Sequence, residues 1–254
     1  LKESDVASLR IERAANEDVA FERRDGKWWM TEPVQAPANP LRIDGILRIA
    51  EAKSRRTYPA QQVDLTKVGL DQPDVQLSFN SGGPVIAFGD TEPLTQARYV
   101  RVGDAVHLID DTGYYHVIGA YTTFIDGALL PEGAVIEGLA LPGLKLSRVD
   151  DRWRAEPQPN QFSVDQVNML LDEWRHAQSM ELRRFEGGKV QGEVVVNLKG
   201  QKEPLRFGIL NRAPELVLVR ADLALEYRLP AEMAEHLLTF PQVPKTETPP
   251  PAAK

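Results

Sequence analysis

The segment Val75-Gln-Leu-Ser-Phe79 recurs in pattern as Val194-Val-Val-Asn-Leu198, 119 positions further along the chain (194 − 75). Both segments are rich in β-branched and apolar residues, which is typical of strands. The same offset aligns two further dipeptides of each copy, Phe88-Gly89 with Phe207-Gly208 and Val100-Arg101 with Val219-Arg220. Self-similarity at a fixed spacing marks a repeated architecture, so these segments predict a tandem duplication.

Upstream of these strands, each copy carries a Trp-x-x-Glu-Pro element, Trp29 to Pro33 and Trp153 to Pro157, at an offset of 124 (153 − 29). A helix is expected after each element. Asn39-Pro40 supplies an N-cap with Pro at the first helical position, and Ser163 with Gln166 has the spacing of a capping box. Loop insertions explain why the offset is 124 for the Trp-x-x-Glu-Pro elements and 119 for the strands that follow.

Strands that run together around one long amphipathic helix indicate the α+β class. We therefore expect two tandem related repeats, each a mainly antiparallel sheet covered by one amphipathic helix. The first repeat is predicted over residues 1–130 and the second, diverged repeat over 131–240, with a Gly- and Pro-rich joint at 126–138. A Pro-rich tail, 241–254, has almost no apolar residues and is expected to be disordered.

Composition excludes several classes of function. The 254 residues carry a net charge of -7, which argues against a general nucleic-acid binder, because such a protein needs a cationic surface. There is no cysteine, so disulfides, thiol nucleophiles and zinc-thiolate sites are excluded. No run of 18 apolar residues is present that could span a bilayer.

The order of motifs in the first copy resembles a known bacterial family. Asp25-Gly-Lys-Trp28-Trp29 is followed by Val68-Gly69-Leu70-Asp71-Gln72-Pro73, then Phe88-Gly89, then Tyr99-Val100-Arg101. This order resembles the domain-of-unknown-function family numbered four-three-four-zero, over most of residues 6–130. The Gly-Leu-Asp-x-Pro and Phe-Gly elements carry most of the resemblance, and the second copy lacks the former.

The resemblance implies a setting for the protein. Such proteins have one N-terminal transmembrane anchor followed by an extracytoplasmic region, and they are often encoded beside gliding-motility-type ABC transporter components. The chain begins with Leu1 rather than Met, and we expect an anchor to precede it. The implied location is periplasmic or extracytoplasmic, anchored to the inner membrane. No catalytic residues are established for the family, so the resemblance assigns none.

Motifs that carry chemistry are missing from the sequence. None of the histidines stands three or four positions from another, so no metal site is expected. The four are His107, His116, His176 and His236. Neither a nucleophile elbow nor a phosphate-binding glycine loop is present, and we expect no catalytic, cofactor-binding or metal-binding residue.

Aromatic residues are the candidates for contact with a partner or ligand. Trp28 and Trp29 are adjacent on a predicted strand and must face opposite ways. The match with Trp153 makes Trp29 the expected core residue and leaves Trp28 near solvent, where it contacts a partner or, in the plainer interpretation, packs under a loop. Tyr114, Tyr115 and Tyr121 either rim a groove between the repeats or fill the joint.

These observations predict a non-enzymatic, membrane-tethered extracytoplasmic accessory or interaction subunit of an ABC transporter or cell-envelope complex. Its expected partners are ABC transporter membrane components or other envelope proteins. The alternative is a binding module for a lipid, glycan or peptide in a cleft between the repeats. A third possibility is a hydrolase without a linear signature, which requires titratable groups that converge in that cleft.

Overall fold

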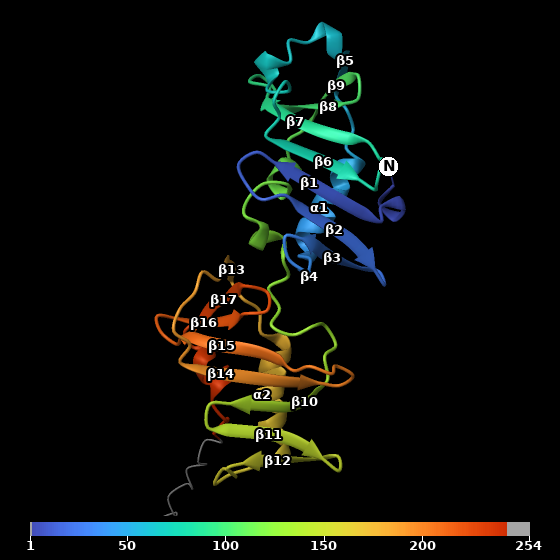
Figure 1. Cartoon of the computed structure of the whole chain (residues 1–254). Coiled ribbons are helices and arrows are strands. Elements are labelled where there is room, and N and C mark those ends of the chain that lie inside the picture. The colour runs from blue at the N-terminus through green and yellow to red at the C-terminus, as the bar shows by residue number, and fades with distance from the viewer. Residues whose placement is uncertain (1, 243–254) are drawn as a thin grey trace, which may run out of the picture. The chain divides into compact units, whose positions relative to one another are not determined.

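The computed structural model describes residues 2–242, and the chain divides into two compact units, Leu1–Asp126 and Gly127–Lys254 (Figure 1). The division lies at the start of the joint expected from the sequence. Residues 243–254 of the predicted Pro-rich tail lie outside the described residues. Each unit contains one antiparallel sheet with few helices, so the α+β class is confirmed.

Unit 1 has a nine-stranded sheet in the order β4-β3-β2-β1-β6-β7-β8-β9-β5. Its strands are β1 (Ser8–Arg13), β2 (Val19–Arg24), β3 (Lys27–Glu32), β4 (Ala36–Pro37), β5 (Arg56–Pro59), β6 (Val75–Phe79), β7 (Val85–Thr91), β8 (Ala97–Val102) and β9 (Ala105–Asp110). Its helices are η1 (Glu3–Asp5), α1 (Pro40–Ala50), η2 (Ala60–Gln62), η3 (Thr66–Val68), η4 (Tyr114–His116) and η5 (Tyr121–Phe124), where η marks a 3₁₀ helix.

Unit 2 has an eight-stranded sheet in the order β12-β11-β10-β14-β15-β16-β17-β13. Its strands are β10 (Ile136–Leu141), β11 (Leu144–Val149), β12 (Arg152–Glu156), β13 (Glu181–Arg184), β14 (Gly192–Leu198), β15 (Leu205–Asn211), β16 (Glu215–Arg220) and β17 (Leu225–Pro230). Its helices are α2 (Val164–His176) and α3 (Met233–Leu238). Apart from the short β4, both sheets have the same strand order and the same place for the long helix in the chain, as a tandem repeat requires.

Strand register supports the same correspondence. Val75 pairs with Phe88 across β6 and β7, and Val194 pairs with Phe207 across β14 and β15. Both pairs keep the 119-residue offset predicted from the sequence. The apolar strand segments that decide the fold therefore hold equivalent places in the two sheets.

The hairpins that carry the tryptophans correct the sequence alignment by one residue. Arg23 pairs with Trp28 across β2 and β3, and Arg148 pairs with Trp153 across β11 and β12. Both hairpins turn through two residues of positive φ, Asp25-Gly26 and Asp150-Asp151. Trp28, rather than Trp29, therefore corresponds to Trp153.

A β-bulge is the reason for the shift. The register of β2 and β3 changes between Ala20 and Phe21, so that Ala20 pairs with Glu32 and Phe21 with Met30, leaving Thr31 unpaired. One extra residue therefore precedes the Glu-Pro pair in unit 1. Since the bulge lies between the tryptophan and the Glu-Pro pair, alignment on Glu-Pro shifts the tryptophans by one position.

The faces of the two tryptophans also differ from the prediction. Alternate residues of a strand share a face, so Trp28 lies on the face of Met30, which is fully buried. Trp29 lies on the opposite face and pairs with Glu22 and Pro37. Both indoles are half-buried. The prediction that Trp29 faces the core and Trp28 faces solvent is wrong.

The two long helices begin where the sequence predicts. The side chain of Asn39 accepts a hydrogen bond from the Arg42 N–H at 3.2 Å, and Ser163 Oγ accepts from the Gln166 N–H at 3.2 Å. Each helix lies across one face of its sheet (Figure 1). Trp174 of α2 is fully buried, and its indole N–H donates to the Leu237 carbonyl at 2.9 Å, which ties α2 to α3.

Part of the opposite face of the unit 1 sheet is covered by the motif that marks the family resemblance, because Leu70 packs with Ala87, Tyr99 and Val106 of β7, β8 and β9. Gly69, with φ of 68°, ends η3, and Leu70 after it is only 2% exposed. A Cβ at Gly89 would lie 2.2 Å from the Val68 carbonyl oxygen. The Gly-Leu-Asp-x-Pro and Phe-Gly elements are therefore the two sides of one close contact, which holds η3 on β7.

Candidate functional site

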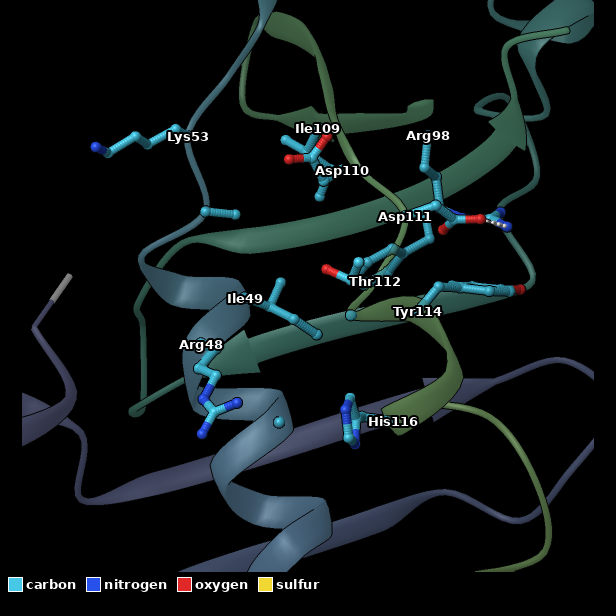
Figure 2. A pocket seen from close by; sticks show the side chains of 14 residues that line it. Arg48, Ile49, Lys53, Arg98, Ile109, Asp110, Asp111, Thr112, Tyr114 and His116 are labelled. Atoms are coloured by element: carbon cyan, nitrogen blue, oxygen red, sulfur yellow. Dashed lines mark hydrogen bonds and ion pairs between the residues drawn. The ribbon is translucent and has the colours of Figure 1, made fainter. Parts of the chain in front are cut away.

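A pocket of about 350 Å³ opens in unit 1 between the C-terminal half of α1 and the end of the sheet (Figure 2). One wall comes from α1, and the other from β7, β8, β9 and the segment that follows β9. The lining residues are Gly45, Arg48, Ile49, Ala52, Lys53, Phe88, Arg98, Ile109, Asp110, Asp111, Thr112, Gly113, Tyr114 and His116. Its volume lies in the range of sites that bind small ligands.

The sheet side of the pocket is fixed by Arg98. Its guanidinium forms an ion pair with Asp111 and donates to Thr91 Oγ1 at 3.1 Å. The guanidinium carbon also lies 3.6 Å from the centre of the Tyr114 ring, a cation–π contact. Only 13% of the Arg98 side chain is exposed. This cation is neutralised and rigidly held, so its evident role is to anchor η4 against the sheet.

Tyr114 completes this anchor. Its ring centre lies 5.6 Å from that of Phe88, and burial raises the pKa of its hydroxyl. The ring thus packs between an aromatic residue of β7 and a cation of β8. We interpret Tyr114 as a packing residue of the pocket wall.

His116 packs on α1 at the one position of that helix with no side chain. A Cβ at Gly45 would lie 2.3 Å from atoms of the His116 ring. His116 Nδ1 is shielded from solvent and has no hydrogen-bond partner among the described residues. Burial, with smaller effects from Arg42 and Arg48, lowers the pKa of this imidazole. The neutral form of His116 therefore predominates at pH 7.

Beside the pocket, Tyr115 projects from η4 into solvent. Its side chain is 61% exposed, and its ring centre lies 4.1 Å from that of His116. The Arg42 guanidinium carbon lies 5.3 Å from the Tyr115 ring on another side. Arg42 is fixed in turn by hydrogen bonds to the Ile118 carbonyl at 3.2 Å and to Thr123 Oγ1 at 3.0 Å. An exposed aromatic ring is thus packed on two sides, against Arg42 and His116.

The aromatic candidates from the sequence occupy different environments. Tyr115 is exposed, Tyr114 is half-buried in the pocket wall, and Tyr121 is only 6% exposed within η5. Trp28 is half-buried on β3. Tyr114 and Tyr115 both belong to η4 but only Tyr114 lines the pocket, while Tyr121 lies in the core.

Sequence reasoning missed Arg42, Gly45 and Arg48 as parts of this site. Arg55, five residues after the end of α1, forms an ion pair with Asp110 of the lining. A glycine inside an amphipathic helix was the available signal, because it costs helix stability and needs a packing reason. The glycine alone does not indicate which side chain packs against the helix at that position.

Two further properties concern the described part of the chain. Residues 2–242 contain no group of three or more His, Cys, Asp or Glu side chains placed to hold a metal ion. No helix in this range has both the length and the apolar character needed to cross a membrane.

The fold and site together define an α+β protein of two antiparallel sheet units, with a ligand-sized pocket in the first. The model of the family described as "Domain of unknown function (DUF4340)" matches residues 28–192. The match covers more than half of the chain, so the chain belongs to this family. It begins in β3 and ends at the first residue of β14, so it omits residues 6–27 of the stretch that carries the sequence resemblance and extends past residue 130 into unit 2. No curated protein and no solved structure matches the chain.

Proposed function

We propose that this chain is a non-enzymatic interaction subunit of an ABC transporter or another cell-envelope complex. In this proposal it works outside the cytoplasm and is tethered to the inner membrane by a segment N-terminal to Leu1. Support for the setting comes from the family resemblance. Support for an interaction role comes from the surface around Tyr115.

The observation that carries the proposal is the fixed, exposed ring of Tyr115. An exposed tyrosine between Arg42 and His116 loses little conformational entropy when a partner covers it. Tyrosine and arginine are also among the residue types that dominate the energy of protein interfaces. A ring held in place before binding is the arrangement expected of an interface anchor.

One apolar neighbour extends this surface. Ile118, whose carbonyl accepts a hydrogen bond from Arg42, is 37% exposed. We call Arg42, Tyr115 and Ile118 the Tyr115 face. A partner with an apolar patch and a hydrogen-bond acceptor for Tyr115 or Arg42 fits its chemistry.

The experiment is affinity capture of the full-length protein from native membranes, with the captured proteins identified by mass spectrometry. We expect Tyr115→Ala to reduce the recovery of ABC transporter membrane components while the variant stays folded. Leu94→Ala is the matched control, because Leu94 is 91% exposed and lies on the β7–β8 connection, away from the Tyr115 face. Equal recovery with Tyr115→Ala and with the unchanged protein contradicts the assignment of this face.

The alternative predicted from the sequence, a lipid, glycan or peptide held in a cleft between the repeats, stays a prediction. Of the three tyrosines proposed to rim such a cleft, Tyr121 is buried. The pocket of Figure 2 lies wholly within unit 1 and concerns a different kind of site.

A further inference from the structure

The charges around the unit 1 pocket are not balanced. Both of its carboxylates are already paired, Asp111 with Arg98 and Asp110 with Arg55. Two other cations of the lining, Arg48 and Lys53, have no side-chain ion pair or hydrogen bond within residues 2–242. In a protein of net charge -7, this pocket is a local site of uncompensated positive charge.

The two free cations belong to one side of the pocket. Figure 2 shows Arg48 and Lys53 on the α1 side, across from the Arg98–Asp111 pair, with the Lys53 side chain extended away from the other labelled residues. Both are exposed, and their long stems can reorient by rotamer changes alone. An anion that enters the pocket can therefore be approached by two cations through rotamer changes, without loss of an existing ion pair.

A third polar group of the lining also lacks a partner. The shielded Nδ1 of His116 has no hydrogen bond among the described residues, and a buried polar atom of this kind calls for a ligand, water or ion. The Arg48 guanidinium is close enough to affect the pKa of His116. The unsatisfied imidazole and one free cation thus share one neighbourhood.

We infer that this pocket binds a phosphate group, with Arg48 and Lys53 as its charge partners and His116 as a hydrogen-bonding partner. Arginine offers a planar fork of donors that matches phosphate oxygens, and lysine adds a mobile point charge. The pocket volume of about 350 Å³ suits a phosphate monoester or a lipid headgroup rather than a macromolecule.

An adjoining hollow could hold the acyl chain of a lipid whose headgroup supplies the phosphate. It has a volume of about 290 Å³, is lined mainly by apolar side chains, and shares Ile49, Ala52 and Ile109 with the first pocket. Phe79, Ile86 and Val100 are among its other lining residues. An acyl chain placed there would leave its phosphate beside the last turn of α1.

Two probes separate the sources, inorganic phosphate and vesicles of phosphatidylcholine with or without phosphatidic acid. Imidazole NMR of the whole chain reports phosphate binding through His116, and co-sedimentation reports vesicle binding. We expect a saturable response to at least one probe. We expect Arg48→Ala with Lys53→Ala to weaken that response at least about tenfold, since each lost charge-assisted contact is worth on that order.

A charge-matched control keeps the test specific. Lys199→Ala with Lys202→Ala removes two exposed cations of unit 2 and should leave binding unchanged. Arg48→Lys with Lys53→Arg should retain most of the affinity. If the double alanine variant fails to fold, the single changes Arg48→Gln and Lys53→Gln decide the question by the same readouts.

Each outcome is decisive. A response to inorganic phosphate that depends on Arg48 and Lys53 supports a free phosphate ligand. A response only to phosphatidic acid vesicles, with the same dependence, supports a lipid headgroup. Equal loss in the unit 2 control, or no saturable response to either probe, overturns the inference. Partner capture through Tyr115 is measured separately, so neither result decides the other.

Discussion

The imidazole of His116 occupies the space that a side chain at Gly45 would need, because a Cβ at that position would lie 2.3 Å from the ring. Glycine in the middle of a helix costs about 1 kcal/mol relative to alanine. Here the missing side chain lets η4 pack directly on α1. This contact places Tyr114 in the pocket wall and Tyr115 at the surface. The candidate site thus depends on this contact together with the packing of Tyr114 between Phe88 and Arg98.

Gly45→Ala should therefore destabilise the protein although alanine is the better helix former. We expect a loss of about 1 to 3 kcal/mol in the free energy of unfolding, the usual effect of overpacking. In a His116→Ala background the same change should stabilise the helix by up to about 1 kcal/mol. Chemical denaturation of the four proteins of this double-mutant cycle measures both values. The same sign in both backgrounds would show that the two residues do not compete for this space.

His116 should also make stability depend on pH. Burial lowers the pKa of its imidazole below its ordinary value of 6.5, so the folded protein binds fewer protons here than the unfolded chain. This contribution is fully present above the unfolded pKa and is lost as pH falls from that value towards the folded pKa. Between pH 7.5 and 5.5, approximately one unit either side of the unfolded pKa, His116→Asn should lose less stability than the unchanged protein. Parallel stability curves for the two proteins would contradict this.

The Phe-Gly element allows a matched comparison between the two units. A Cβ at Gly89 would meet the Val68 carbonyl oxygen at 2.2 Å, whereas a Cβ at Gly208 would meet only side-chain atoms of Val190 at 3.2 Å. Backbone cannot move aside as a side chain can. Gly89→Ala should thus destabilise unit 1 by about 1 to 3 kcal/mol, and Gly208→Ala should affect unit 2 less. Hydrogen exchange assigned to each unit distinguishes the two effects, and a larger loss for Gly208→Ala would refute the role of the η3 contact.

The repeat, the α+β class and the helix starts were predictable, because they depend on local signals. Alternating apolar residues in Val75–Phe79 and the caps at Asn39 and Ser163 act over a few positions, and each is confirmed. The family was predictable from the order of its motifs, and it too is confirmed.

The candidate site was not predictable from the sequence. His116 reaches Gly45 across 71 positions (116 − 45), and no local pattern records which ring fills the space above a helical glycine. The bulge at Thr31 was equally hidden, because a register change depends on the pairing of two strands. An alignment on Glu-Pro that does not include the bulge assigns Trp28 and Trp29 to the wrong faces of the strand.

The corrected register makes a prediction about the tryptophans. Trp28 and Trp153 hold equivalent places in their hairpins, opposite Arg23 and Arg148, and Trp28 shares its face with the buried Met30. Truncating a fully buried tryptophan costs about 3 to 5 kcal/mol, and these half-buried rings should cost about 1 to 3 kcal/mol each. Trp28→Ala and Trp153→Ala should therefore each lower the stability of their own unit, and Trp29→Ala should lower that of unit 1 less than Trp28→Ala. Chemical denaturation followed by hydrogen exchange in each unit measures the three losses. A greater loss for Trp29→Ala than for Trp28→Ala would support the alignment of Trp29 with Trp153. Trp28 would then again be a candidate partner contact.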